Sequence, residues 1–575
     1  MKRQISLFAC FCCLFCPLIG SAQSWQWGIG CKTYGTQGFD GTAMTADNMG
    51  GIYVAGLAID DSTQFGPFII HQSTWYGQMV IFKTDSAGSY RYVINSGGTA
   101  NGWPSAIATD NTGNLYVFGR YYGAANDSFV LDTITLTSTT AGEMYFLAKL
   151  SPAGHAIWAT NVAKDSFPHL FNGGMGVDGA GNIYIGGDFD FPHSISIGST
   201  TLTNTDTSLP YSTDLFLAKY DPTGHPIWAK RYGGRHNDYL NGFAVTPSGN
   251  FYITGKFGAG SAAPDTFVIG SDTLTDATVT MADPGTFYAK FDKDGNPIWA
   301  KTLNHHIKGM GMIITDPSEQ LYFNGYIDTA ITIGSYPLAT FGDYDAAFGR
   351  FDSAGNIIWA HSAGGSGRDA GFGMTLDSSG DMWLTGNMNH VNYGVAGYTM
   401  NFQGNILTVP SVNFDPMYIV EYSGEGTYIF GTTLVSGGDD FSGLCADDLC
   451  NIYVGGDYMH VDMIFNTDTL LEEGGPIEDL FIAKYRYGIC GTALSLSASG
   501  QTDGIMLYPN PAFTELNISS GSKTITSVCL TNLTGQEVYN QNYNQAKVQV
   551  DVAQLPAGLY FVKVNGQDVR KFVKE

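Results

Sequence analysis

The aspartates of a recurring turn are the first residues in this sequence whose type and spacing could bind a metal ion. The pattern Asp-x-x-Gly-Asn recurs along the chain, and its copy DKDGN at residues 292–296 has the acidic spacing with which a calcium-binding loop begins. Such a loop needs several oxygen ligands, usually including a later acidic one. Here the apolar segment PIW follows at once, and other copies of the turn have threonine where this one has Asp294. We therefore interpret the aspartates as turn caps that accept backbone N–H bonds, and we expect no metal site and no cofactor.

Polar and aromatic residues in the connections between strands form a second group. Their carboxylates, imidazoles, guanidinium and indole could bind a ligand, and a pair of carboxylates could cleave a glycosidic bond if the two lay at a defined separation. Charges on solvated loops are the simpler interpretation, and no set of catalytic residues stands out. The candidate ligand-binding residues are Asp40, Trp103, His236, Asp238, His305, His306, Arg368, Asp369, Asp439 and Asp440.

Two cysteines, Cys445 and Cys450, stand close together in CADDLCNIYV. Cys450 occupies the place of a turn glycine in three other copies of this segment, Gly113, Gly181 and Gly249, and a residue other than glycine is costly there unless something compensates. A disulfide across the turn would compensate in an exported protein, so we predict a Cys445–Cys450 bond. Two cysteine ligands alone argue against a zinc site.

These groups are carried by a repeat. The segment GNIYIGGDF at 181–189 recurs at residues 113, 249 and 450, with looser copies at 51, 320 and 381. A second element, such as FLAKYDPTGHPIWA at 216–229, recurs beside it at intervals of roughly 65 residues. Alternating apolar residues and Gly-rich turns predict strands, four in each unit.

Seven four-stranded antiparallel units predict a β-propeller, in which each blade covers the next. Copies of the first three strands number seven, but the last unit ends at 480–488 without a fourth strand, whereas a spare strand, SWQWGIG, stands at 24–30. The N-terminal strand is therefore expected to complete the seventh blade. The Asp-x-x-Gly-Asn turns then lie on one face of the disc, and the candidate ligand-binding residues lie around the channel on the other.

The repeats resemble the secreted bacterial β-propeller repeat family, in which a Trp-Ala strand, an Asp-x-x-Gly-Asn turn and an aromatic-Val-x-Gly strand recur. The resemblance spans about residues 24–488. It implies the fold and says little about activity, because propellers host many unrelated functions.

Export is indicated by the N-terminal segment and by composition. Residues 1–22 have a charged start, an apolar run and a small-residue cleavage site, as in a signal peptide, and no later segment is long and apolar enough to span a membrane. The formal net charge is −25, which disfavours nucleic acid and anionic membranes as partners. We assign 23–489 to the propeller.

A small polar linker, 490–505, leads to a second domain at 506–575, whose alternation and turn residues predict a small β-sandwich. Its motifs resemble the C-terminal sorting domain of the type IX secretion system of Bacteroidota, which implies secretion or attachment to the outer surface of the outer membrane, with the secretion machinery as partner. The residues that carry the resemblance are Tyr508, Pro509, Asn510, Pro511, Gly535, Gly558, Tyr560 and Lys571.

Together these features predict an all-β exported protein, a seven-bladed β-propeller closed by an N-terminal strand and followed by a small β-sandwich. The leading hypothesis is a non-catalytic module that binds a glycan or a surface protein. The alternative is a carbohydrate-active enzyme, a glycosidase or lyase, with its site at the loop face of the channel. A structural component of the cell surface with no small ligand is the third hypothesis.

Overall fold

The computed structural model contains strands and turns, and no helix among the residues it describes. It describes residues 24–487 and 506–574 apart from 35–38, 48–49, 60–61, 72–76, 139–140, 166–172, 191–193, 205–211, 260–264, 277–283, 304–306, 390–397, 410–415, 436, 459–461, 466–467, 471–478, 509–511, 513, 520–523, 533–535, 546, 557 and 566–567. The chain divides into two compact units between Cys490 and Gly491. Each unit is described by itself.

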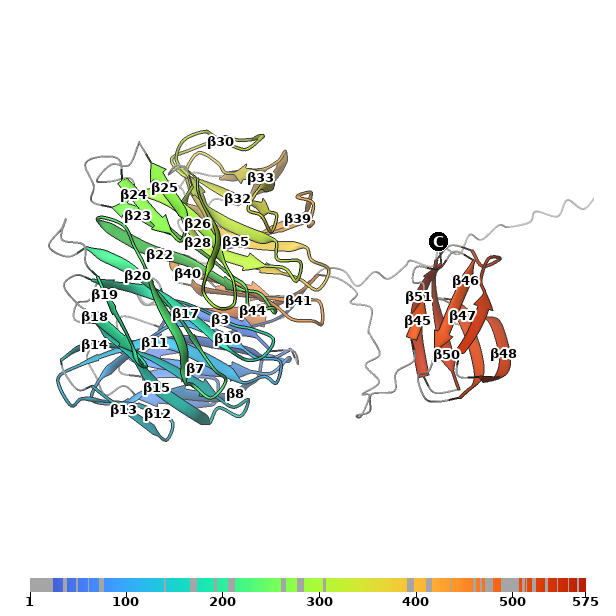
Figure 1. The fold of residues 1–575 in the computed structure, drawn as a ribbon, viewed down its shortest axis with the longest axis horizontal. Coiled ribbons are helices and arrows are strands. Elements are labelled where there is room, and N and C mark those ends of the chain that lie inside the picture. The colour runs from blue at the N-terminus through green and yellow to red at the C-terminus, as the bar shows by residue number, and fades with distance from the viewer. Residues whose placement is uncertain are drawn as a thin grey trace, which may run out of the picture. The chain divides into compact units, whose positions relative to one another are not determined.

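The described part of the first unit contains seven four-stranded antiparallel sheets, numbered here in chain order (Figure 1). Sheet 1 contains β3 (Phe39–Ala46), β4 (Ile52–Ala58), β7 (Gln78–Thr84) and β8 (Tyr90–Asn95). Sheet 2 contains β10 (Asn101–Thr109), β11 (Leu115–Gly123), β14 (Gly142–Leu150) and β15 (Ala156–Asp165). Sheet 3 contains β16 (Gly174–Val177), β17 (Ile183–Asp190), β20 (Thr213–Tyr220) and β21 (Pro226–Tyr232).

The remaining sheets repeat this order. Sheet 4 contains β22 (Asn237–Val245), β23 (Phe251–Ala259), β26 (Gly285–Phe291) and β27 (Pro297–Thr302). Sheet 5 contains β28 (Lys308–Thr315), β29 (Leu321–Ile327), β32 (Asp345–Phe351) and β33 (Ile357–Ala363). Sheet 6 contains β34 (Arg368–Leu376), β35 (Met382–Asn389), β38 (Pro416–Tyr422) and β39 (Tyr428–Val435). Sheet 7 contains β40 (Gly437–Ala446), β41 (Asn451–Tyr458), β44 (Asp479–Arg486) and β1 (Ser24–Gly30).

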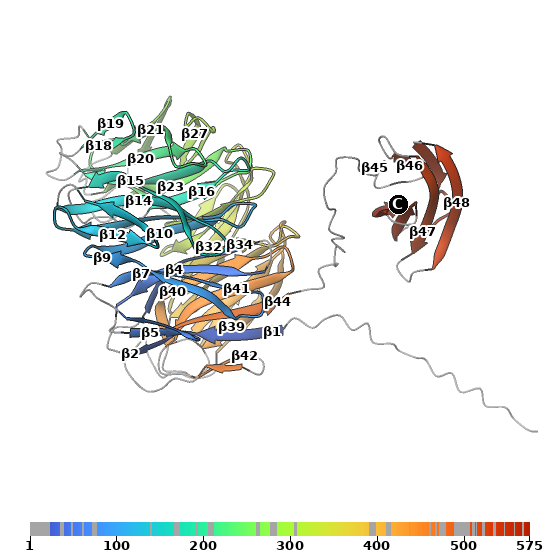
Figure 2. The ribbon, with the colours of Figure 1, turned by 90° about the horizontal axis from the view of Figure 1, so that it is seen from below.

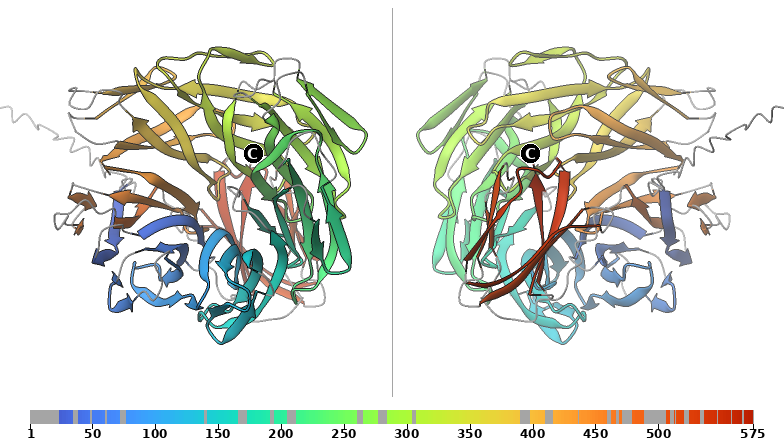
Figure 3. Two further views of the ribbon diagram at one scale, coloured as in Figure 1. Left: turned by 90° about the vertical axis from the view of Figure 1, so that its left-hand side faces the viewer. Right: turned by 90° about the vertical axis from the view of Figure 1, so that its right-hand side faces the viewer.

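Sheet 7 is built from both ends of the unit. The N-terminal β1 pairs antiparallel with β44, from Ser24 opposite Arg486 to Gly30 opposite Phe481, and Figure 2 shows the two strands side by side. This is the pairing expected from the unmatched strand at 24–30. The first strand of each sheet contacts the first strand of the next sheet, and β40 of sheet 7 contacts β3 of sheet 1. Figure 3 shows the sheets following one another around a common axis, with the orange strands beside the blue ones.

Burial explains why the second and third strands have such continuous apolar sequences. All residues of β4, β7, β17, β20 and β41 are buried, because a neighbouring sheet covers each face. The fourth strand lies at the edge of its sheet and is more exposed, so Ile157, Ile227 and Ile298 are each about half exposed.

A short hairpin, which the sequence analysis did not predict, lies between the second and third strands of every sheet. It contacts the fourth strand of its own sheet, in sheets 3 and 6 also the fourth strand of the sheet before, and in sheet 4 also the second strand. The hairpins are β5 (Ser62–Phe65) with β6 (Phe68–His71), β12 (Ser128–Leu131) with β13 (Ile134–Thr137), β18 (Ser194–Ile197) with β19 (Thr200–Thr203), β24 (Asp265–Ile269) with β25 (Asp272–Asp276), β30 (Ile331–Ile333) with β31 (Tyr336–Leu338), β36 (Thr399–Phe402) with β37 (Asn405–Thr408), and β42 (Met463–Phe465) with β43 (Asp468–Leu470). Two further strands, β2 (Lys32–Tyr34) and β9 (Gly97–Gly98), pair with β5 and β12.

The second unit contains two antiparallel sheets with one core. One sheet contains β45 (Met506–Tyr508), β46 (Glu515–Ser519) and β49 (Lys547–Asp551). The other contains β48 (Glu537–Gln545), β47 (Ile525–Asn532), β50 (Gly558–Val564) and β51 (Asp568–Lys574). Side chains from both sheets, including Leu516, Val528 and Val562, form a single buried cluster.

Candidate functional site

Buried Asp, Tyr and Lys side chains form a set that recurs from sheet to sheet. In sheet 2, Lys149 Nζ donates to the Tyr116 hydroxyl at 2.6 Å and lies 3.3 Å from the Asp110 carboxylate. The Asp starts the turn between the first and second strands, the Tyr lies on the second strand and the Lys on the third. Burial alone would raise the pKa of Asp110, but hydrogen bonds from Asn114 and Thr112 hold this pKa below its usual range. We call this group the Asp–Tyr–Lys set.

The sets link neighbouring sheets, which assigns them a structural role. In sheet 1, Lys83 contacts both Asp47 and Tyr53 at 2.9 Å, and the Tyr53 hydroxyl donates to the Gly113 carbonyl of sheet 2 at 2.8 Å. Lys484 of sheet 7 donates to the Ser86 carbonyl of sheet 1 at 2.9 Å. Each buried ammonium therefore neutralises a carboxylate and satisfies acceptors of its own or the next sheet.

Tryptophans on the fourth strands bind the next sheet in the same way. Trp158 of sheet 2 donates its indole N–H to the Pro222 carbonyl of sheet 3 at 3.2 Å, and its ring lies against the turn glycine Gly224. Trp27 of β1 donates to the Ser86 carbonyl of sheet 1 at 3.1 Å. Equivalent bonds are made by Trp228, Trp299 and Trp359.

Two of the predicted ligand-binding carboxylates are buried in the loops that carry them. Asp238 is 1% exposed and accepts from the backbone N–H groups of Gly234 and Gly258. Asp369 is fully buried and accepts from the Gly365 N–H at 2.6 Å and from the Tyr398 hydroxyl at 2.8 Å. Burial raises the pKa of Asp369 to about 7. Both side chains hold the connection between two sheets in place.

Two other predicted residues remain at least partly accessible and stack with neighbours. The guanidinium of Arg120 lies 5.7 Å from the ring of Trp103, its partner across β10 and β11. Arg368, whose side chain is about half exposed, lies 5.4 Å from the Tyr344 ring. Both pairs lie at the ends of the sheets opposite the Asp-x-x-Gly-Asn turns.

The other predicted ligand-binding residues are only partly described. His236 is partly buried and has a left-handed backbone, with φ of 64°. Asp40 lies on β3 and Asp439 and Asp440 lie on β40, but the positions of their side chains are outside the described part of the structure, as are His305 and His306 entirely.

The predicted Cys445–Cys450 disulfide is wrong. Cys445 is a free thiol in the core cluster that contains Tyr453, and burial raises its pKa. Cys450 is disulfide-bonded, but Cys445 is not its partner. Cys450 has φ of 61°, the conformation expected of the glycine that it replaces.

The residues of the sorting motif are distributed along the second unit. Tyr560 on β50 is 5% exposed, and its hydroxyl donates to the Pro556 carbonyl at 2.8 Å. Tyr508 lies on β45, Gly558 on β50 and Lys571 on β51, where Lys571 pairs with Phe561. Pro509, Asn510, Pro511 and Gly535 lie outside the described residues.

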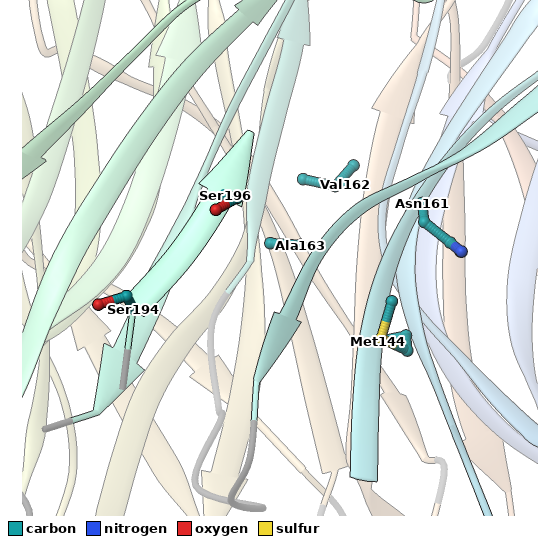
Figure 4. A pocket seen from close by; sticks show the side chains of 6 residues that line it. All are labelled: Met144, Asn161, Val162, Ala163, Ser194 and Ser196. Carbon is teal, nitrogen blue, oxygen red and sulfur yellow. The ribbon is translucent and has the colours of Figure 1, made fainter. Parts of the chain in front are cut away.

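A pocket of about 290 Å³ lies between sheet 2 and the first hairpin strand of sheet 3 (Figure 4). It is lined by Met144, Asn161, Val162, Ala163, Ser194 and Ser196. These side chains offer one amide and two hydroxyls but no titratable group, so this pocket suits binding of a small neutral group better than acid–base chemistry.

One protein family matches part of the chain. Residues 506–575 match the family described as the secretion system C-terminal sorting domain. This match indicates export through the type IX secretion system, to the cell surface or the extracellular space, and an interaction with its machinery. Among the described residues we find no helix with the length and apolar character to cross a membrane.

Curated relatives and solved structures resemble the chain more distantly. A WD repeat-containing protein of Acanthamoeba polyphaga mimivirus is 23% identical over 60% of this chain and 28% of its own length. The regulatory protein FlaEY of Caulobacter vibrioides is 25% identical over 54% of this chain and 32% of its own. The chain thus spans about a third or less of these relatives.

Two solved structures are similar to most of the chain at low TM-scores. A protein of unknown function from Dyadobacter fermentans has a TM-score of 0.35 and 9% identity, covering 81% of this chain and 99% of its own. Pseudomonas fluorescens PhoX has a TM-score of 0.33 and 10% identity, covering 79% of this chain and 90% of its own.

Proposed function

We propose that the first unit, residues 23–489, is a closed seven-bladed β-propeller. The contacts between successive first strands, including β40 with β3, and the pairing of β1 with β44 support closure. The mimivirus relative contains WD repeats, which also build propellers. In this proposal residues 1–22 are a signal peptide that is removed, 490–505 are a linker, and 506–575 form a β-sandwich that directs secretion.

The propeller acts outside the cell as a non-catalytic binding module. One observation carries this proposal: two arginine–aromatic pairs, Trp103 with Arg120 and Tyr344 with Arg368, lie at the loop ends of the sheets. Aromatic faces stack on sugar rings or apolar groups, and guanidinium groups donate hydrogen bonds to hydroxyl or carboxylate oxygens. Because Asp238 and Asp369 are buried in their loops, they support this face without contacting the ligand. The ligand class that fits is an extracellular glycan.

Binding to a panel of polysaccharides by the full secreted chain tests this function. We expect one polymer class to retain the protein without release of soluble sugar. Trp103→Ala or Arg368→Ala should weaken retention about tenfold, since a hot-spot contact contributes about 1.4 kcal/mol or more. Arg91→Ala is the matched control, because Arg91 is exposed and pairs with Asp85 at the turn between the third and fourth strands.

Two results would reject the binding module. Retention by none of the polymers would remove the glycan as ligand. Release of reducing or unsaturated ends, abolished by changes at the loop face, would favour the carbohydrate-active enzyme that the sequence left open.

A further inference from the structure

Sheet 6 keeps the aspartate of the Asp–Tyr–Lys set but departs from the set at its other two positions. Its turn aspartate is Asp377, but Trp383 replaces the tyrosine and Glu421 replaces the lysine. The turn also ends with Asp381, where most copies have an asparagine. Two carboxylates therefore take the places of an amide donor and an ammonium group. If ionised, the three carboxylates carry a charge of −3 where the other sheets are close to neutral.

The three carboxylates converge. One oxygen from each of Asp377, Asp381 and Glu421 lies within 4.8 Å of the other two. Asp377 is held by the Trp383 indole N–H at 3.1 Å, and Asp381 accepts from the Gly424 N–H at 3.1 Å. Hydrogen bonds thus fix two of the three groups before any ligand binds.

Glu421 provides a separate indication that something is bound here. It is 5% exposed, and its Oε2 atom has no hydrogen-bond partner within the described part of the chain. A buried carboxylate oxygen without a partner is costly, because it has lost its hydration without replacement. The carboxylates of Asp377 and Asp381 lie close by, so an ionised Glu421 is also repelled by two like charges. A cation would remove both costs.

The position in the fold explains why a lysine would not serve here. The equivalent cation in sheets 3, 4 and 5 donates to a carbonyl in the turn between the third and fourth strands of the next sheet, as Lys219 does to Lys293 O and Arg350 to Gly424 O. The sheet after sheet 6 is sheet 7, whose fourth strand is the N-terminal β1. No turn joins β44 to this fourth strand, so the described residues of sheet 7 offer no turn carbonyl of this kind.

We propose that Asp377, Asp381 and Glu421 bind a divalent cation with oxygen coordination, best fitted by Ca²⁺. Carboxylate oxygens suit both Ca²⁺ and Mg²⁺, but Ca²⁺ tolerates the irregular coordination that three fixed carboxylates and water would provide, whereas Mg²⁺ requires near-ideal octahedral geometry. The partly exposed Asp381 leaves room for water to complete the coordination. In sheet 6, which is next to the sheet built from both ends of the first unit, the bound ion takes the place of the lysine or arginine side chain found in the other sheets.

The test uses the full secreted chain after treatment with a chelator. Calorimetric titration should show one Ca²⁺ bound per chain, with weaker binding of Mg²⁺. Terbium bound in place of Ca²⁺ should luminesce on excitation of tryptophan, because Trp383 contacts the ligand Asp377. Addition of Ca²⁺ should displace terbium and raise the melting temperature.

Substitutions then locate the site. Glu421→Gln should weaken Ca²⁺ binding at least tenfold. The double change Asp381→Asn with Glu421→Lys introduces the residues found at these two positions in sheet 7, Asn451 and Lys484. It should abolish binding and, because it also removes the repulsion among the carboxylates, melt no lower than the metal-free wild type. Asp294→Asn, in the acidic turn of sheet 4, is the matched control and should bind Ca²⁺ normally.

The proposal fails if the wild type binds neither Ca²⁺ nor terbium at millimolar concentration, or if Glu421→Gln binds as the wild type does. If Glu421→Gln does not fold, the double variant decides, since its loss of binding supports the site and unchanged binding rejects it.

Discussion

The indole N–H of Trp27 donates a hydrogen bond of 3.1 Å to the carbonyl oxygen of Ser86. This bond joins the N-terminal strand of sheet 7 to the turn between the third and fourth strands of sheet 1. The other fourth-strand tryptophans make the same bond, but a turn joins each of their strands to the third strand of the same sheet, whereas no turn joins β1 to β44. Side-chain contacts such as that of Trp27 therefore help to hold β1 in place.

Trp27→Ala should therefore destabilise the first unit strongly. Trp27 is 8% exposed, and truncation of a buried tryptophan costs about 3–5 kcal/mol. Urea unfolding of the full chain, followed by tryptophan fluorescence and circular dichroism, measures the change. Trp359→Ala is the control, because Trp359 is also buried and makes the same kind of bond from a fourth strand that a turn joins to its third strand, and it should lower the midpoint less. Equal shifts of the midpoint would show that the bond is no more important for β1 than for a fourth strand that a turn joins to its sheet.

Alanine substitutions at two glycines distinguish the free-energy cost of backbone strain from the cost of crowding a tryptophan side chain. Gly224 and Gly113 both have positive φ, 87° and 78°, so alanine is strained at either. A Cβ at Gly224 would lie 2.9 Å from Trp158, whereas the nearest atom to one at Gly113 is 3.6 Å away. We expect Gly224→Ala to cost about 1–3 kcal/mol more than Gly113→Ala in chemical unfolding, since overpacking adds to strain. Equal costs would mean that the tryptophan moves aside freely.

Cysteine mapping tests the corrected disulfide assignment. Alkylation of the unfolded, unreduced chain should label Cys31, Cys445 and Cys529 and leave Cys450 unlabelled until a reductant is added. Mass spectrometry of the digest then identifies the peptide linked to Cys450. A bond within the peptide that contains both Cys445 and Cys450 would contradict this assignment.

Asp369 should make stability depend on pH. Its pKa is raised to about 7 by burial and by the nearby Asp345, so the folded state prefers the protonated acid. The stabilisation is complete below about pH 4, the pKa in the unfolded chain, and is lost as pH rises through about 7. A shift of about 3 units corresponds to on the order of 4 kcal/mol.

Asp369→Asn should remove this dependence and leave the chain less sensitive to pH between about 4 and 7. The Asn side chain still accepts from the Gly365 N–H. Unfolding free energies at several pH values provide the measurement. Asp343→Asn, an exposed residue of the neighbouring segment, should keep the wild-type profile. An unchanged profile in Asp369→Asn would assign the pH dependence to other groups, with Asp345 the first to test.

The sorting domain makes a prediction about secretion. Deletion of 506–575 should leave the protein inside the cell envelope of a bacterium with a type IX system, whereas the full chain should reach the surface or the medium. Fractionation and immunoblotting distinguish these locations. Cys529→Ser, which keeps the domain intact, is the control for expression and should be secreted. Secretion of the shortened chain would mean that the export signal lies elsewhere.

The repeating strands could be predicted from the sequence because period-two patterns and glycine turns recur in every copy. The pairing of β1 with β44 followed from counting strands. The hairpins between the second and third strands were missed, although IGSTTLT at 197–203 and IGSDTLT at 269–275 carry a signal for them. Their copies vary more than the other strands do, because each contacts mainly the edge of its own sheet or of the sheet before it.

The candidate site was harder to predict because sequence does not say which way a polar side chain faces. Asp369 looked like a loop ligand, but the loop folds back so that its carboxylate accepts the Gly365 N–H. Cys445 looked close enough to bond Cys450, but its strand places it in the core beside Tyr453. The unusual character of Glu421 could have been found in the sequence, because this acidic residue stands at a position where the other copies of the repeat have Lys or Arg.

The pairing of β1 with β44 also sets an order of events during biosynthesis. The Thr33 side chain, just after β1, bonds to Asp479, a residue 446 positions later. The ribosome makes β1 near the start and β44 near the end, so β1 waits for its partner until almost the whole unit exists. A prematurely terminated chain lacks β44 and leaves strand edges exposed to proteases. Completion of sheet 7 therefore distinguishes chains that end before β44 from chains that contain the whole first unit.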